Sequence, residues 1–83
     1  MRVTVKLYAT LADYLPAGSK NNRTEIEVAG DAAVDAVLAP FLLPAKLTHL
    51  VLVNGVFVPP AERATTALRE GDVLAVWPPI AGG

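Results

Sequence analysis

The residues best suited to chemistry form the C-terminal tail, in which two prolines, an aliphatic residue and a small residue lead into two glycines. These residues are Pro78, Pro79, Ile80, Ala81, Gly82 and Gly83. The reactive group that we expect is the terminal carboxylate of Gly83, because a terminal carboxyl group in a model peptide has a pKa of about 3.3–3.7 and is ionised at neutral pH. Such a carboxylate can attack the α-phosphate of ATP if the tail reaches into another protein's active site.

Each part of this tail suits insertion into a narrow channel. Gly82 and Gly83 lack a Cβ atom, so they fit a confined space and adopt backbone angles that other residues avoid. Pro78 and Pro79 have a fixed φ angle, so less conformational entropy is lost when the tail is bound. Two terminal glycines alone more often form an inert end, and the stiff segment before them is what favours a functional tail.

The rest of the sequence offers no obvious catalytic group. The absence of cysteine excludes disulfides, thiolate nucleophiles, thiolate metal sites and a cysteine persulfide. The single histidine, His49, is too little for a metal site, and we interpret it as a residue on the surface of the sheet. We find no phosphate-binding loop, paired carboxylates or Ser/His/Asp arrangement. We therefore expect no metal, no bound cofactor and no catalysis by this chain alone.

Length and composition predict one small ordered domain. The sequence has 83 residues, and 53% of them are hydrophobic, which exceeds the usual fraction of about 45–50%. We expect a single domain over residues 1–83, in which residues 78–83 form an extended tail. Because the hydrophobic fraction is above the usual value, some apolar side chains could lie on the surface and bind a partner.

Charge and hydropathy argue against binding to nucleic acid or membranes. Seven basic and eight acidic residues are scattered along the sequence and give a net charge of -1. No apolar run approaches the roughly 18 residues of a membrane-spanning helix. The first residues alternate like a strand and do not resemble a signal peptide. We therefore expect a cytoplasmic protein.

Hydrophobic periodicity and turn residues predict the elements that hold the tail. In order, these are a strand at 2–9, a short helix at 11–15 capped by Thr10, a strand at 23–29, a helix capped by Asp31 and limited by Pro40, strands at 48–54 and 56–58, a connection at 61–70 and a strand at 73–77. Asn54 and Gly55 are expected to form only a hairpin turn. The order predicts an α+β fold of the β-grasp (ubiquitin-like) type, with a mixed sheet of four to five strands and one main helix packed across it.

The alternation in the last strand predicts which side chains face the core. We place Leu74 and Val76 inward, so Ala75 and Trp77 lie on the open face of the sheet. We interpret Trp77 and Ala75 as a partner surface with the tryptophan as its anchor, although Trp77 fits a core position equally well.

The charged side chains give no sign of a second site. Glu25 and Glu27 alternate with apolar residues, and we interpret them as the solvated face of their strand. Three basic side chains are interpreted as surface charges that favour solubility, one of which could pair with a partner: Lys46, Arg63 and Arg69.

Over essentially its whole length, the sequence resembles the MoaD/ThiS family of ubiquitin-like sulfur carriers, and most closely the MoaD branch. The resemblance rests on residues 6–11 (Lys-Leu-Tyr-Ala-Thr-Leu), 53–55 (Val-Asn-Gly), 68–72 (Leu-Arg-Glu-Gly-Asp) and 76–83 (Val-Trp-Pro-Pro-Ile-Ala-Gly-Gly). MoaD proteins typically carry the paired prolines, which ThiS proteins usually lack. The sequence departs from the family in the middle helix, which Pro40 and Pro44 interrupt.

The resemblance implies a sulfur carrier that acts as the small subunit of molybdopterin synthase in molybdenum cofactor biosynthesis. A MoeB-like partner would adenylate the Gly83 carboxylate with ATP, and a sulfurtransferase would supply the sulfur that converts it to a thiocarboxylate. The tail would insert into the MoaE-like large subunit within a heterotetramer. The partners would supply all the catalytic groups, so the resemblance leaves open whether the chain counts as an enzyme.

Two other functions stay open at this point. The chain could donate thiocarboxylate sulfur in thiamine thiazole formation, tRNA thiolation or cysteine synthesis, because such carriers share the fold and the terminus. It could instead be a ubiquitin-like modifier or a β-grasp interaction module. A carrier loses its activity when a residue is appended after Gly83, whereas a docking module tolerates the extension and a modifier forms conjugates with target proteins.

Overall fold

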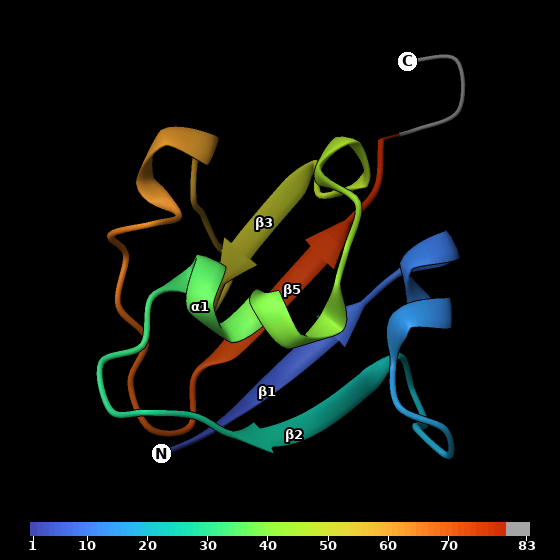
Figure 1. Cartoon of the computed structure of the whole chain (residues 1–83), viewed down its shortest axis with the longest axis horizontal. Coiled ribbons are helices and arrows are strands. Elements are labelled where there is room, and N and C mark those ends of the chain that lie inside the picture. The colour runs from blue at the N-terminus through green and yellow to red at the C-terminus, as the bar shows by residue number, and fades with distance from the viewer. Residues whose placement is uncertain (80–83) are drawn as a thin grey trace.

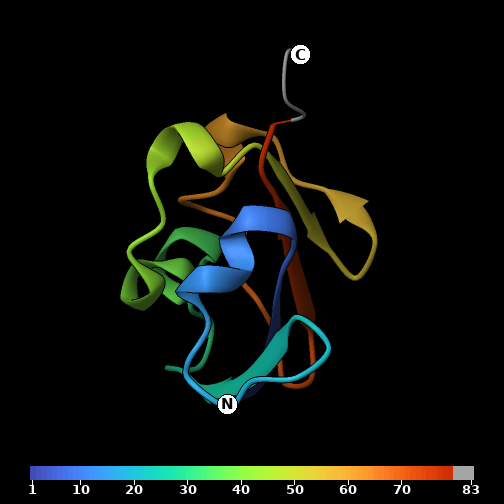
Figure 2. The same cartoon turned by 90° about the vertical axis from the view of Figure 1, so that its right-hand side faces the viewer.

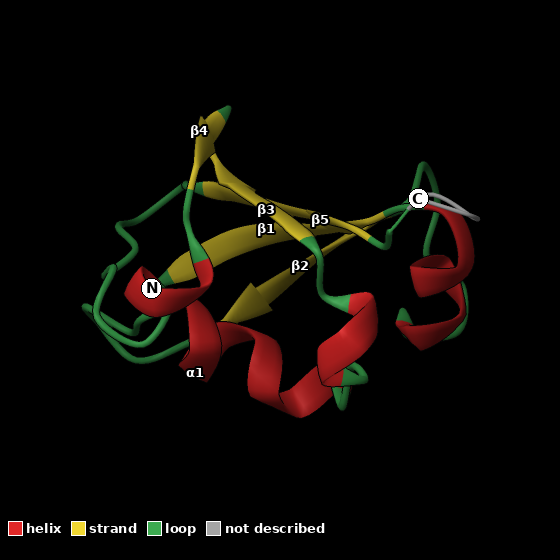
Figure 3. Ribbon diagram, turned by 90° about the horizontal axis from the view of Figure 1, so that it is seen from above, coloured by secondary structure: helices red, strands yellow, loops and turns green. Residues whose placement is uncertain are grey.

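Five strands form one mixed sheet, and the helical segments pack against one of its faces. The computed structural model describes residues 1–79. Across the sheet, the strands are β2 (Arg23–Glu27), β1 (Arg2–Leu7), β5 (Val73–Trp77), β3 (Leu50–Val53) and β4 (Val56–Phe57). Figure 1 shows α1 (Val34–Leu38) in front of the sheet, and Figure 3 shows the helical segments on one side of it.

The strand pairing confirms the predicted β-grasp fold. β1 pairs antiparallel with β2 and parallel with β5, and β5 pairs antiparallel with β3. β3 and β4 form a short hairpin at the edge of the sheet. The segment between β2 and β3 crosses the helical face, since parallel central strands require a long crossover between the two halves of the sheet.

The core lies between the sheet and the helical segments. Alternate side chains of the strands point into it, as the period of two in the sequence predicts. The sheet contributes Val3, Val5, Leu7, Val51, Leu74 and Val76, the helix α1 contributes Val34, Val37 and Leu38, and the margins contribute Leu11, Phe41, Val58 and Leu68. The predicted inward placement of Leu74 and Val76 is confirmed, because both side chains have no exposed area.

The main helix is shorter than predicted and begins later. α1 follows Ala33, and the prediction that Asp31 is its N-cap is wrong. Asp31 lies before the helix and has a left-handed backbone with φ +61°. Pro40 falls in a 3₁₀ turn, η2 (Ala39–Phe41), that directly follows α1, so the helix ends where the proline was predicted to limit it.

Main-chain acceptors from another loop replace the expected side-chain cap of α1. The N–H of Val34 donates to the Thr66 carbonyl at 3.0 Å, and the N–H of Asp35 donates to the Arg63 carbonyl at 3.0 Å. These donors would otherwise be unsatisfied at the helix end. Packing of the segment 63–66 against the helix therefore decides where α1 begins.

The short helix after β1 also begins at a different residue from the one predicted. It is a 3₁₀ helix, η1 (Ala9–Tyr14), and its N-cap is Tyr8, so the prediction of Thr10 as the cap is wrong. Two further 3₁₀ turns, η3 (Ala45–Leu47) and η4 (Pro60–Glu62), lie before the predicted strand at 48–54 and after the predicted strand at 56–58. The first three long strands are each shorter than predicted, whereas β5 has the predicted bounds.

Candidate functional site

The tail leaves the sheet from its central strand. β5 lies between β1 and β3, and the chain continues from its end through Pro78 and Pro79. Figures 1 and 2 show this end of β5 at the top of the molecule, opposite the N-terminus and close to η1 and η3. The tail therefore begins on a strand that is paired on both sides.

The last two main-chain carbonyls of β5 accept hydrogen bonds from segments on its two sides, one next to β1 and the other next to β3. The N–H of Tyr8 donates to the Val76 carbonyl at 3.1 Å, and the N–H of His49 donates to the Trp77 carbonyl at 3.2 Å. Pro78 and Pro79 have no N–H group, so they cannot donate hydrogen bonds that would extend the ladder. Within residues 1–79, the Trp77 carbonyl is the last point along the chain at which the sheet holds the tail.

Trp77 lies on the open face of the sheet, beside the tail. Its neighbour Val76 is fully buried in the core, so Trp77 points to the opposite face, where it stacks on Tyr8 with ring centroids 4.4 Å apart. Ala75 lies on the same face but is only 8% exposed, so it offers a partner little contact area. The role of these residues as a partner surface stays a prediction.

Apolar side chains gather on the open face around Trp77. Leu50 pairs with Trp77 across the sheet, and Phe57 pairs with Leu52, so these side chains share one face. Phe57 is 51% exposed and Leu50 is 36% exposed. We call the set the open-face patch; its members are Tyr8, Leu50, Leu52, Phe57 and Trp77. Exposed apolar clusters of this kind mark binding surfaces.

The other half of the open face is charged. Arg2 forms ion pairs with Glu27 at 3.0 Å and with Glu25 at 3.8 Å. All three side chains are well exposed, so these pairs contribute little to stability. The interpretation of Glu25 and Glu27 as the solvated face of their strand is confirmed. This charged group lies at the start of β1 and on β2, whereas Tyr8 of the open-face patch follows the other end of β1.

Comparison with known proteins identifies the family. A family model described as the ThiS family matches residues 5–83. The chain belongs to the ThiS family. The resemblance to the MoaD/ThiS proteins is thereby confirmed, and the chain is a member of a family of ubiquitin-like sulfur carriers.

Solved structures of similar proteins share the fold over the whole chain. SAMP1 from Haloferax volcanii is 31% identical, with 100% of both chains covered and a TM-score of 0.68. The thiamine biosynthesis protein ThiS from Geobacter metallireducens is 17% identical, with 100% of both chains covered and a TM-score of 0.66. A chain in the complex of subunits 1 and 2 of molybdopterin-converting factor from Helicobacter pylori 26695 is 19% identical, with 100% of both chains covered and a TM-score of 0.63. A comparison with curated proteins gave no match.

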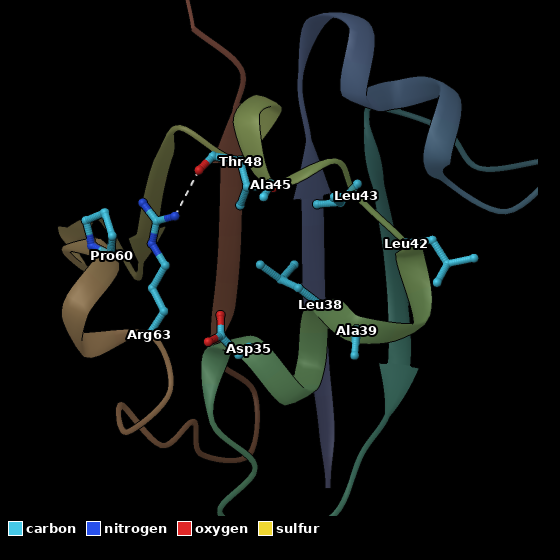
Figure 4. Close-up of a pocket in the computed structure, with 9 residues that line it drawn as sticks. All are labelled: Asp35, Leu38, Ala39, Leu42, Leu43, Ala45, Thr48, Pro60 and Arg63. Atoms are coloured by element: carbon cyan, nitrogen blue, oxygen red, sulfur yellow. Dashed lines mark hydrogen bonds between the residues drawn. The ribbon is translucent and has the colours of Figure 1, made fainter.

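In this ThiS-family chain, Arg63 is not the surface charge that we predicted. Its side chain is only 7% exposed. Its Nη1 donates to the Thr48 carbonyl at 2.8 Å, its Nη2 to the His49 carbonyl at 2.9 Å and its Nε to the Val58 carbonyl at 3.3 Å. Figure 4 shows the side chain along a groove on the helical face, with its guanidinium directed at Thr48. The other two predicted surface charges are exposed: Lys46 and Arg69.

Asn54 does more than form the predicted hairpin turn. Asn54 and Gly55 have φ angles of +50° and +84°, as the turn requires. The Asn54 side chain also accepts a hydrogen bond from the Val73 N–H at 2.9 Å and donates one to Asp72 Oδ1 at 2.9 Å. These bonds tie the β3–β4 hairpin to the start of β5. The motifs at 53–55 and 68–72 therefore meet in one structural unit.

The described residues include Trp77 and the start of the predicted tail, Pro78 and Pro79, which together we call the root of the tail. They show no other recognisable site. Within residues 1–79, no group of three or more His, Cys, Asp or Glu side chains is arranged to hold a metal ion. No helix in this part of the chain is long and apolar enough to cross a bilayer. Pro78 and Pro79 are described, whereas the remaining predicted tail residues lie outside the described residues: Ile80, Ala81, Gly82 and Gly83.

Proposed function

We propose that this chain carries sulfur as a thiocarboxylate on Gly83 and delivers it as the small subunit of molybdopterin synthase, in molybdenum cofactor biosynthesis. The observation that carries the proposal is the root of the tail. There, the central strand β5 ends at Trp77, whose carbonyl accepts a hydrogen bond from the His49 N–H, and two prolines follow directly. Because the Trp77 carbonyl is hydrogen-bonded and the two prolines have fixed φ angles, less conformational entropy is lost when the tail enters a partner's active site.

The chemistry at Gly83 takes place on partner enzymes. A carboxylate oxygen attacks the α-phosphorus of ATP in a MoeB-like enzyme, and pyrophosphate leaves. A sulfur nucleophile at the oxidation level of sulfide, supplied through a sulfurtransferase, then attacks the acyl carbon and displaces AMP. The chain contributes the carboxylate and the binding surface, which fits a sequence without cysteine.

The open-face patch is the surface that we assign to these partners. The activating enzyme and the MoaE-like large subunit both hold the same tail, so both must contact the molecule next to Trp77. Partly exposed aromatic and aliphatic side chains suit such a contact. The structure of subunits 1 and 2 of molybdopterin-converting factor from Helicobacter pylori supports a stable complex of this kind. We propose a heterotetramer of two chains with two large subunits.

The paired prolines favour the molybdopterin branch over the other sulfur-transfer pathways, because MoaD proteins typically carry them. A modifier is the second candidate. It is favoured by the 31% identity with SAMP1 of Haloferax volcanii, a small archaeal modifier protein. A modifier would pass the activated carbonyl of Gly83 to a lysine amine of a target protein, and no sulfur would reach a pterin.

Sulfur transfer from the prepared thiocarboxylate separates these two functions. The thiocarboxylate is made by cleaving a C-terminal intein thioester with sulfide and is mixed with the large subunit and the pterin precursor. The proposal predicts that the intact mass of the chain returns to that of the carboxylate while a dithiolene pterin forms. A variant without Gly83, treated in the same way, is the control. Retained sulfur, together with lysine-linked conjugates in a cell extract, would replace the proposal with the modifier function.

A further inference from the structure

Arg63 places a buried positive charge among main-chain carbonyls close to the root of the tail. Its guanidinium contacts two successive carbonyls, those of Thr48 and His49, and a third from Val58. Within the described residues, the ion pairs involve other side chains and not Arg63. A buried charge is costly unless hydrogen bonds satisfy it, so these three bonds are what allow Arg63 to stay inside.

One peptide unit joins this guanidinium to the tail. The carbonyl of Thr48 and the N–H of His49 belong to the same planar unit, in which they point in opposite directions. Arg63 Nη1 donates to that carbonyl at 2.8 Å, and the N–H donates to the Trp77 carbonyl at 3.2 Å. Fixing one end of the unit therefore orients the other end. A charged donor on the carbonyl also polarises the unit and strengthens its N–H as a donor.

The Trp77 carbonyl belongs in turn to the peptide unit that Pro78 completes. The His49 N–H binds this carbonyl beside the last ladder pair of the sheet, Leu50 with Trp77, and so helps to fix the plane of that unit and the direction in which Pro78 leaves the strand. The opposite neighbour, Tyr8, holds only the preceding carbonyl, that of Val76. The orientation of the tail thus depends on the segment just before β3, where the His49 N–H binds the Trp77 carbonyl. Arg63 binds the same segment through the Thr48 carbonyl.

We propose that Arg63 is a positioning residue for the tail. Acting through the Thr48–His49 peptide unit and the Trp77 carbonyl, its guanidinium sets the direction in which the tail enters the activating enzyme. This inference rests on the proposed function and adds to it a residue whose side chain lies on the helical face and not in the open-face patch. The Arg63 side chain is buried on that face, so a partner bound to the patch does not contact it, and we expect its main effect on how the tail is presented. Lysine cannot replace it, because a single ammonium lacks the planar fork that holds two carbonyls at once.

The test compares Arg63→Lys with Arg69→Lys, an exposed arginine that serves as the matched control. The adenylating enzyme is assayed by ATP–pyrophosphate exchange at increasing concentrations of the chain. In Arg63→Lys we expect kcat to fall about tenfold or more, because misplacing a reacting group by about 1 Å has such effects. We expect the KM for the chain to change by less than about threefold, since the patch is intact. An unchanged kcat in the folded variant, or a loss confined to KM, overturns the proposal.

A measurement on the free chain separates this inference from the proposed function. By NMR, the His49 amide of Arg63→Lys should exchange its hydrogen about tenfold faster or more than in the natural chain, while the amide of Val5 in the core keeps its rate. If the natural chain is not adenylated, the proposed function fails, and faster exchange at His49 still supports the positioning of the tail root. An unchanged His49 amide overturns the positioning in either case.

A second variant covers the case in which Arg63→Lys does not fold. Semisynthesis replaces the amide nitrogen of His49 by an ester oxygen, which removes the N–H and leaves the Arg63 side chain in place. We expect the same fall in kcat with little change in KM. An unchanged kcat in this ester variant overturns the proposal.

Discussion

The indole of Trp77 lies parallel to the phenol ring of Tyr8, with 4.4 Å between the ring centroids and 5° between the ring planes. The two residues come from β5 and from the residue that follows β1, so the stack joins the two central strands where the tail begins. A stacked pair has lost much of its side-chain freedom before any partner binds. Trp77 is therefore a preorganised contact at the base of the tail.

Trp77→Ala should weaken binding to the large subunit by about tenfold or more, because a large aromatic side chain is often the main anchor of an interface. Isothermal titration calorimetry measures the affinity, and circular dichroism shows whether the variant folds. Tyr14→Ala is the matched control, since Tyr14 is a partly exposed aromatic on η1 and outside the open-face patch. A folded Trp77→Ala chain with unchanged affinity would remove Trp77 from the interface.

Phe57→Asp should also weaken binding by about tenfold or more, because it places a charge in the apolar patch that the partner must desolvate. The side chain is 51% exposed, so the substitution should leave the free energy of unfolding nearly unchanged. Leu42→Asp is the control, because Leu42 is 81% exposed and borders the groove on the helical face. Equal losses of affinity in both variants would show that the partner does not distinguish the two faces.

Asn54 should contribute measurably to stability through its two side-chain hydrogen bonds to Asp72 and Val73. Asn54→Gly keeps the left-handed turn accessible and loses the bonds, so we expect a cost of about 1 kcal/mol. Asn54→Ala loses the bonds and also strains the turn, so we expect about 1 kcal/mol more. Urea denaturation gives both values. Equal stability of Asn54→Gly and the natural chain would show that the turn alone matters.

The strands of the sheet could be predicted from the sequence because their signals are local. Alternation in β5 identified Leu74 and Val76 as core residues, and Asn54 with Gly55 identified the hairpin. The side of the sheet on which Trp77 lies followed from the same alternation. The fold class then followed from the order of the elements.

The remaining features depend on contacts between distant segments. The start of α1 is set by the carbonyls of Arg63 and Thr66, which lie far along the chain and leave no trace near Asp31. Arg63 looked like a solvated charge because its partners are main-chain carbonyls, whose arrangement depends on the fold and not on residue type. The link between Asn54 and Asp72 joins two motifs that the sequence shows only as separate turns.

Intact mass spectrometry shows whether the carboxylate of Gly83 accepts sulfur, as we propose. The chain is incubated with the MoeB-like adenylating enzyme, ATP and a sulfur source, beside one variant lacking Gly83 and another with one residue appended after it. We predict a mass increase equal to the exchange of one oxygen for one sulfur, seen only in the natural chain. An unchanged mass, while the same enzyme converts another carrier in a parallel reaction, would show that Gly83 does not accept sulfur.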